Sequence, residues 1–286
     1  MEPMPSNPAP ALSSLPRIIA ALHLLPSPHS RRPQTYSLTQ IVDHALLHAR
    51  LAYEGGVRAA YLQDVHDTPV APTILPETIN TVTTVGQELK KAFPDLHLGV
   101  CLMQHGAKEP LQIAQDIGAD FVRIKVYMGV MIKAEGMLTG CAYEAIQQRA
   151  HMNAAHLNAA HPKAGHIRIF ADIYDRVGVP LCPLPLAEAC RQAVVFGQAD
   201  GLVLTGMNVD DSVSMFDQIA PMNLGVPLIL GGSATAHNLA SFAHAAHIIV
   251  HGAFIKKGVP AQNGLPVDWG SDEIRAFMAS VHRIWA

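Results

Sequence analysis

Two short runs in the last third of the sequence place glycines directly after an apolar stretch. Leu-Ile-Leu is followed by Gly231-Gly232-Ser233, and Ile-Ile-Val is followed, after one histidine, by Gly252-Ala253. Glycine lets backbone N–H groups approach an anion closely, and a helix that starts nearby adds a favourable dipole. These five residues therefore predict a phosphate site. The simpler alternative is that the glycines only form tight turns.

A third apolar run ends in Thr205-Gly206 and is followed by Asn208. The hydroxyl of Thr205 and the amide of Asn208 can donate hydrogen bonds to an oxyanion. Both residues are therefore further candidates for holding the substrate or its phosphate.

The run 121–126 alternates two cations, Arg123 and Lys125, with apolar residues. In a strand, this alternation places both cations on one face. Buried cations need partners, and Asp64 and Asp172, which close other apolar runs, are the obvious ones. A desolvated Lys125 is suited to forming a Schiff base or to binding an anionic or carbonyl group. The alternative is an internal layer of ion pairs.

Asp64 and Asp172 are the predicted acid and base, because two carboxyls across one site can exchange protons with a substrate. His23, at the end of the first apolar run, is a second candidate proton carrier. Arg123 and Lys125 are the predicted electrostatic stabilisers.

The same carboxylates could bind a divalent metal ion together with His23 or His105, but no HxH or HExxH spacing supports such a site. No metal ligand and no cofactor is therefore predicted. Most of the sixteen histidines are expected to have no role in the site, and His151, His156 and His161, which recur at five-residue intervals, are interpreted as solvated. The chain has neither a GxSxG elbow nor a Walker lysine motif.

The elements that must position these residues alternate regularly along the chain. Apolar runs rich in Val, Ile and Leu predict eight buried parallel strands, at 17–24, 58–63, 97–103, 121–126, 167–173, 201–206, 227–231 and 247–252. Apolar residues at three- and four-residue spacing predict eight helices between them, at 38–54, 77–92, 107–117, 141–159, 185–197, 210–219, 235–244 and 271–284.

Eight strand–helix units without a break in composition predict an α/β fold, a single (β/α)₈ TIM barrel over residues 17–286. Residues 1–16 are rich in Pro and Ser and are predicted to form a short irregular arm. An open doubly wound sheet is the alternative, but no GxGxxG follows the first strand. In a barrel, the candidate residues share one mouth at the carboxyl ends of the strands. The loop 127–140, with Gly129, Gly136 and Gly140 as possible hinges, is predicted to be a mobile lid over the substrate, and a static wall is the alternative.

Composition limits the function. The formal net charge is −3 and the pI is about 6.6, which leaves no basic surface for nucleic acid. No apolar run reaches the length of a membrane span, and the start of the chain does not resemble a secretory signal. The four cysteines form no CxxC pair, as expected for reduced thiols in a cytoplasmic protein.

An ordered series of motifs resembles the BtpA/SgcQ family of TIM barrels, from about Arg17 to Phe277. The series is Leu22-His23-Leu24-Leu25-Pro26, Pro76-Glu77-Thr78, Gly118-Ala119-Asp120-Phe121-Val122-Arg123, Gly129 with Gly136 and Gly140, Ala171-Asp172, Thr205-Gly206, Gly231-Gly232-Ser233, Lys256-Lys257-Gly258 and Pro266-Val267-Asp268. The resemblance implies a soluble homo-oligomeric barrel with phosphosugar-like or nucleotide-like ligands. It implies little about the reaction.

The chain departs from the family pattern at the mouth. Gln63-Asp64 stands where the family tends to have Glu-Asn, Lys125 where an Asn is common, and Arg176-Val177 where a Lys-His pair is common. Either the substrate differs from the family's usual one, or this member has lost catalysis.

Three hypotheses follow from the sequence. The first is an enzyme that cleaves or rearranges a phosphorylated sugar or ribosyl compound by acid–base catalysis, as a lyase, glycosyl hydrolase or isomerase. The second is an aldolase-like enzyme with Lys125 as its Schiff-base amine. The third is a non-catalytic assembly or biogenesis factor that uses the barrel as a scaffold.

Overall fold

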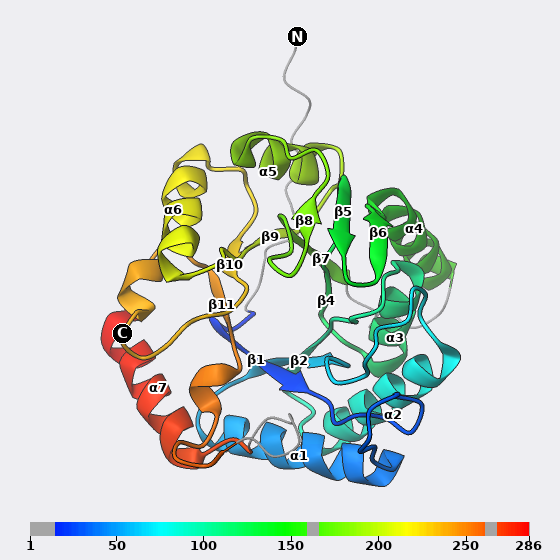
Figure 1. Ribbon diagram of the computed structural model, residues 1–286, viewed down its shortest axis with the longest axis vertical. Coiled ribbons are helices and arrows are strands. Elements are labelled where there is room, and N and C mark those ends of the chain that lie inside the picture. Colours follow the sequence, from blue (N-terminus) through cyan, green and yellow to red (C-terminus); the bar gives the residue numbers. More distant parts are fainter. Residues whose placement is uncertain (1–14, 159–165, 261–267, 286) are drawn as a thin grey trace.

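The computed structural model describes residues 15–158, 166–260 and 268–285. Eight parallel strands close into a barrel in the order β1-β11-β10-β9-β7-β4-β3-β2, with the helices around it (Figure 1). The predicted TIM barrel is therefore confirmed. The barrel strands are β1 (Ile18–His23), β2 (Ala59–Gln63), β3 (His97–Val100), β4 (Phe121–Ile124), β7 (Arg168–Asp172), β9 (Gly201–Leu204), β10 (Leu228–Leu230) and β11 (His247–Val250).

Seven α-helices surround the barrel in the described part of the chain. They are α1 (Leu38–Glu54), α2 (Pro76–Ala92), α3 (Lys108–Ile117), α4 (Ala142–Asn158), α5 (Leu186–Val195), α6 (Val209–Ile219) and α7 (Ser271–Trp285). None of them combines the length and apolar character needed to cross a bilayer. Ser37 begins α1 with a capping box in which its hydroxyl accepts from Gln40 N and Gln40 reaches back to the Ser37 amide.

The prediction of a helix at 235–244 is wrong, because this segment contains only the 3₁₀ turn η2 (Leu239–Phe242). The Asn238 side chain accepts from Thr235 N at 2.7 Å and donates to the Ser233 carbonyl at 2.9 Å. Such side-chain bonds to the backbone compete with helical ones. The seventh strand is thus followed by a short loop and a turn in place of a full helix.

Layers of side chains fill the barrel interior. The rings of Phe121 and Phe170 stack with centroids 4.9 Å apart. Gly99 and Gly201 leave room for these rings, because a Cβ would lie 2.2 Å from Phe121 at Gly99 and 2.8 Å from Phe170 at Gly201. The interior is a packed core, as in other barrels of this type, so the candidate site is sought at its carboxyl end.

Residues 15 and 16 belong to this packing. Leu15 is buried with the interior cluster, and the Pro16 carbonyl lies 3.1 Å from His247 Nδ1. The last two residues of the predicted arm therefore contact the barrel. The rest of that arm lies outside the described residues, as do Pro266 and Val267.

The segment predicted as a long loop at 127–140 contains a β-hairpin. Its strands β5 (Val130–Lys133) and β6 (Gly136–Thr139) are antiparallel, and β8 (Val179–Pro180) extends them to a three-stranded sheet beside the barrel mouth (Figure 1). Two antiparallel pairings hold this segment beside the mouth, and its role as a mobile lid stays a prediction.

Candidate active site at the barrel mouth

Arg123 and Asp172 form a buried ion pair on neighbouring strands. Arg123 Nε lies 2.8 Å from Asp172 Oδ1, and Nη2 lies 2.9 Å from Oδ2, which is the bidentate geometry of a guanidinium and a carboxylate. Arg123 also donates to the Tyr61 hydroxyl at 3.2 Å. Burial lowers the pKa of Arg123, but Asp172 more than offsets this, and the pKa lies well above its ordinary value. Both oxygens of Asp172 are therefore already occupied.

Asp64 directly follows β2 and is also buried, but it is only half satisfied. Its Oδ1 accepts a 2.7 Å hydrogen bond from Met103 N, while Oδ2 is buried without a partner among the described residues. Burial raises the pKa of Asp64 to about 6, although the bond from Met103 and the charge of Lys125 oppose the shift. A carboxyl with this pKa and a free oxygen can take up or release a proton near neutral pH.

Lys125 continues the line of β4 beyond Arg123 and points into the same mouth, as the alternation predicts. Its ammonium lies 2.9 Å from the thioether of Met103. No carboxylate is within ion-pair distance of it in the described part of the chain. Its charge nevertheless acts on Asp64, Asp172 and Asp175. An ammonium held this way is available to a substrate oxyanion or carbonyl.

The first glycine turn packs tightly against β9. A Cβ at Gly231 would lie 1.9 Å from Thr205 Oγ1 and 3.1 Å from Arg123, so only glycine fits here. The Gly231 amide is bonded to the Leu204 carbonyl. Thr205 Oγ1 is buried and without a partner among the described residues.

The next two residues of this turn are open. Ser233 has a φ of +67°, a left-handed conformation that is costly for a residue with a side chain and that collects at functional sites. Arg176, from the loop after β7, donates to Ser233 Oγ at 3.0 Å. A cation and a strained turn thus meet beside Gly232, whose amide makes no bond within the described chain.

The second glycine turn begins with a histidine. His251 Nδ1 lies 3.1 Å from the Ala21 carbonyl, and its ring stacks on His23 with centroids 3.7 Å apart. Burial, followed by His251 and His66, lowers the pKa of His23 well below its ordinary value, so His23 is a neutral imidazole at pH 7. Gly252 has no atom within 4 Å of a Cβ position. A side chain would fit there, in contrast to Gly231.

Asn208 is the N-cap residue of α6. Its side-chain oxygen accepts from Asp211 N at 2.9 Å, which caps the start of α6. The side-chain oxygen of Asn208 therefore already accepts a hydrogen bond from the protein backbone.

The hairpin brings to the mouth one residue that sequence reasoning did not assign, and it also contacts the candidate His105. Lys133 on β5 forms a buried 2.7 Å ion pair with Asp175, which follows β7. His105, from the loop after β3, lies 2.7 Å from the Thr139 carbonyl through its Nε2. A small pocket between these links is lined by Met103, His105, Arg123, Lys125 and Lys133, among others. No local pattern marks Lys133, because its partner lies 42 residues away.

A second cluster was also missed. His44 and His48 on α1 lie beside Asp268, at the edge of the mouth next to Trp269. The signal was present in the sequence, since two histidines four residues apart in a predicted helix share one face. Asp268 could not be found in this way.

Comparison with solved structures supports the fold. The structure of KGPDC from Streptococcus mutans superposes with a TM-score of 0.56 and 12% identity, covering 96% of this chain and all of that one. The same protein in complex with D-R5P gives a TM-score of 0.55 at 13% identity, covering 95% of this chain and all of that one. At these identities the likeness concerns the barrel alone.

Sequence relatives cover most of the chain. An uncharacterized protein of Archaeoglobus fulgidus is 28% identical over 242 residues, 84% of this chain and 92% of its own length. The photosystem I biogenesis protein BtpA of Synechocystis is 25% identical over 243 residues, 84% of this chain and 80% of its own. The model of the BtpA family matches residues 16–283, and the chain therefore belongs to the BtpA family.

Proposed function

We propose that this chain is an enzyme that acts on a phosphorylated small molecule of the sugar or ribosyl type, with Asp64 as the group that transfers protons. The observation that carries the proposal is the contrast between one satisfied and one unsatisfied carboxyl in the same mouth. Among the described residues, Asp64 retains a buried oxygen without a partner and has a pKa of about 6, and Lys125 nearby has no carboxylate partner.

In the proposed reaction, the Asp64 carboxylate accepts a proton from the substrate carbon or hydroxyl that enters the mouth. Negative charge then develops on the neighbouring substrate oxygen, and the Lys125 ammonium stabilises it in a site of low dielectric. Asp64 returns the proton to complete a cleavage or a rearrangement. Arg123 and Asp172 hold each other and position the wall of the site.

The phosphate would lie at the other side of the mouth. The amide groups of Gly232, Ser233, Gly252 and Ala253 make no hydrogen bond within the described part of the chain, and Arg176 adds a positive charge beside Ser233. TIM barrels often bind phosphate between the loops after these two strands. The neighbour bound to D-R5P, a ribose phosphate, supports the same ligand class.

A ligand screen tests this assignment. Inorganic phosphate, ribose 5-phosphate and other phosphosugars are added to the protein, and thermal unfolding is followed. A ligand at 100 times its Kd stabilises the folded state by about 2.7 kcal/mol. We expect Arg176→Gln to weaken this effect. Arg191→Gln, an exposed arginine on α5 that pairs with Glu188, is the control and should leave it unchanged. If no phosphorylated ligand raises the Tm, the proposal is wrong.

The unpaired Lys125 favours a second candidate, an aldolase-like enzyme that forms a Schiff base. The Lys125 amine would attack a substrate carbonyl carbon, with loss of water, to give an imine. Borohydride reduction in the presence of a carbonyl substrate would then fix the ligand to the chain, as measured by intact mass. Labelling that disappears in Lys125→Met would favour this candidate over proton transfer by Asp64.

A further inference from the structure

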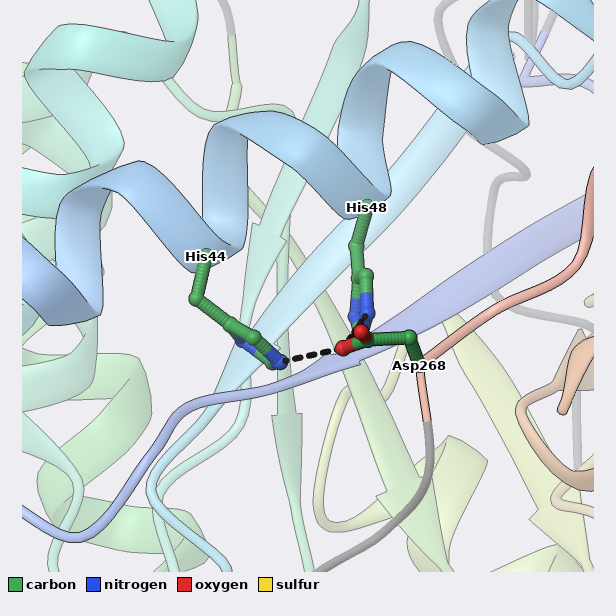
Figure 2. Close-up of side chains that lie close together, drawn as sticks. All are labelled: His44, His48 and Asp268. Carbon is green, nitrogen blue, oxygen red and sulfur yellow. Dashed lines mark ion pairs between the residues drawn. The ribbon is translucent and has the colours of Figure 1, made fainter. Parts of the chain in front are cut away.

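Three side chains from distant parts of the sequence converge beside the barrel mouth. His44 and His48 lie one turn apart on α1 and both point towards Asp268, which precedes α7 (Figure 2). His44 Nε2 lies 3.6 Å and His48 Nε2 lies 3.4 Å from the same oxygen, Oδ1 of Asp268. The ligand atoms of all three residues lie within 4.8 Å of one another.

These separations suit a metal ion better than direct hydrogen bonds. A hydrogen bond between a ring nitrogen and a carboxylate is about 2.9 Å long. Nitrogen and oxygen ligands about 2.1 Å from a tetrahedral Zn²⁺ ion lie about 3.4 Å apart. Both histidine–carboxylate separations are close to this second value, so two edges of a tetrahedral site already have nearly the required length.

The surroundings hold the two rings in position. His48 is 2% exposed and stacks on Trp269 with centroids 4.8 Å apart and planes inclined by 7°. His44 is 13% exposed and its ring centroid lies 4.1 Å from that of His48. Asp268 is 62% exposed, so the site opens to solvent on its side. The Trp269 amide lies 3.3 Å from His48 Nε2, and an ion would replace this long bond.

We propose that His44, His48 and Asp268 bind one divalent transition-metal ion of the zinc type, with the fourth coordination position open to solvent. Two imidazoles and one carboxylate are a known ligand set for Zn²⁺ with an open position. The ion ties α1 to the residue that leads into α7, a link across more than 200 positions of the chain. This site goes beyond the proposed function, since no step of that reaction uses the ion.

The test is metal binding by the full chain, and its readout does not depend on activity. The protein is stripped with a chelator, and ZnCl₂ is titrated by calorimetry and in thermal unfolding. CoCl₂ is added in parallel, because tetrahedral Co²⁺ absorbs visible light. We expect one ion per chain, a higher Tm with the metal, and a Co²⁺ spectrum of low coordination number.

Variants separate this site from other histidines. Asp268→Asn changes an exposed side chain and should fold normally, and His44→Gln provides a second ligand change. Each should weaken Zn²⁺ binding by roughly tenfold or more, since even changes beyond the ligands cost 10- to 100-fold. His237→Gln removes an exposed histidine that is not one of the three proposed ligands and is the matched control. Equal Zn²⁺ affinity in all four proteins, including the unchanged chain, would overturn the proposal.

Discussion

Two carboxyls in the mouth of this barrel are equally buried but differ in their partners. Asp172 uses both oxygens on the Arg123 guanidinium, whereas Asp64 uses one oxygen on a backbone amide and leaves the other without a partner among the described residues. The first arrangement stabilises a fixed wall. The second leaves a buried carboxyl with a pKa of about 6, and we propose this group for proton transfer. Burial alone does not distinguish the two carboxyls, whereas their hydrogen-bond partners do.

The largest change in stability is expected for Asp172→Ala. It leaves the buried Arg123 guanidinium without its carboxylate, and breaking a buried pair in this way costs about 3–5 kcal/mol. Urea unfolding should report this loss, while Asp217→Asn, at an exposed position on α6, should change stability by less than about 0.5 kcal/mol. A loss below about 1 kcal/mol for Asp172→Ala would mean that the pair is not the structural element described here.

Asp64→Asn should have the opposite effect on stability. The pKa of Asp64 is raised by burial, so the folded state holds its proton more tightly than the unfolded chain. The contribution of the protonated Asp64 carboxyl to the free energy of unfolding is complete below about pH 4. This contribution is lost as the pH rises through about 6. At pH 7 the ionised carboxyl destabilises the fold by on the order of 3 kcal/mol, which asparagine removes.

The measurement is unfolding of both proteins at pH 4 and pH 7. The increase in the free energy of unfolding caused by Asp64→Asn should be seen at pH 7 and should be much smaller at pH 4. Turnover of the ligand found by the screen should fall by roughly 100-fold or more. Retained turnover in this variant would remove Asp64 from the reaction.

Lys125→Met should have the smallest effect on stability, because no carboxylate of the described residues lies within ion-pair distance of the ammonium and its charge acts on Asp64 and Asp175 only at longer range. The charge of Lys125 lowers the pKa of Asp64. Its removal should therefore move the acidic inflection of the pH–rate profile to higher pH. An unchanged inflection would show that the two groups do not act on each other.

The sequence was sufficient for the barrel and for part of the site. Strand alternation placed Arg123 and Lys125 inside the barrel, and the position of Asp172 at a strand end made it the partner of Arg123. The difference between Asp64 and Asp172 could not be predicted, because it depends on the Met103 amide. The hairpin was also missed, since its short strands pair only with each other and with β8.

The two interior phenylalanines have an evolutionary consequence. Each ring occupies the space left by a glycine on the neighbouring strand, Gly99 beside Phe121 and Gly201 beside Phe170. A larger residue at either glycine is tolerated only when the facing ring is replaced by a smaller side chain. Within the family, the glycine and the phenylalanine of each pair should therefore change together, so that the combined volume of the two side chains stays the same. This should hold whatever the chemistry at the mouth.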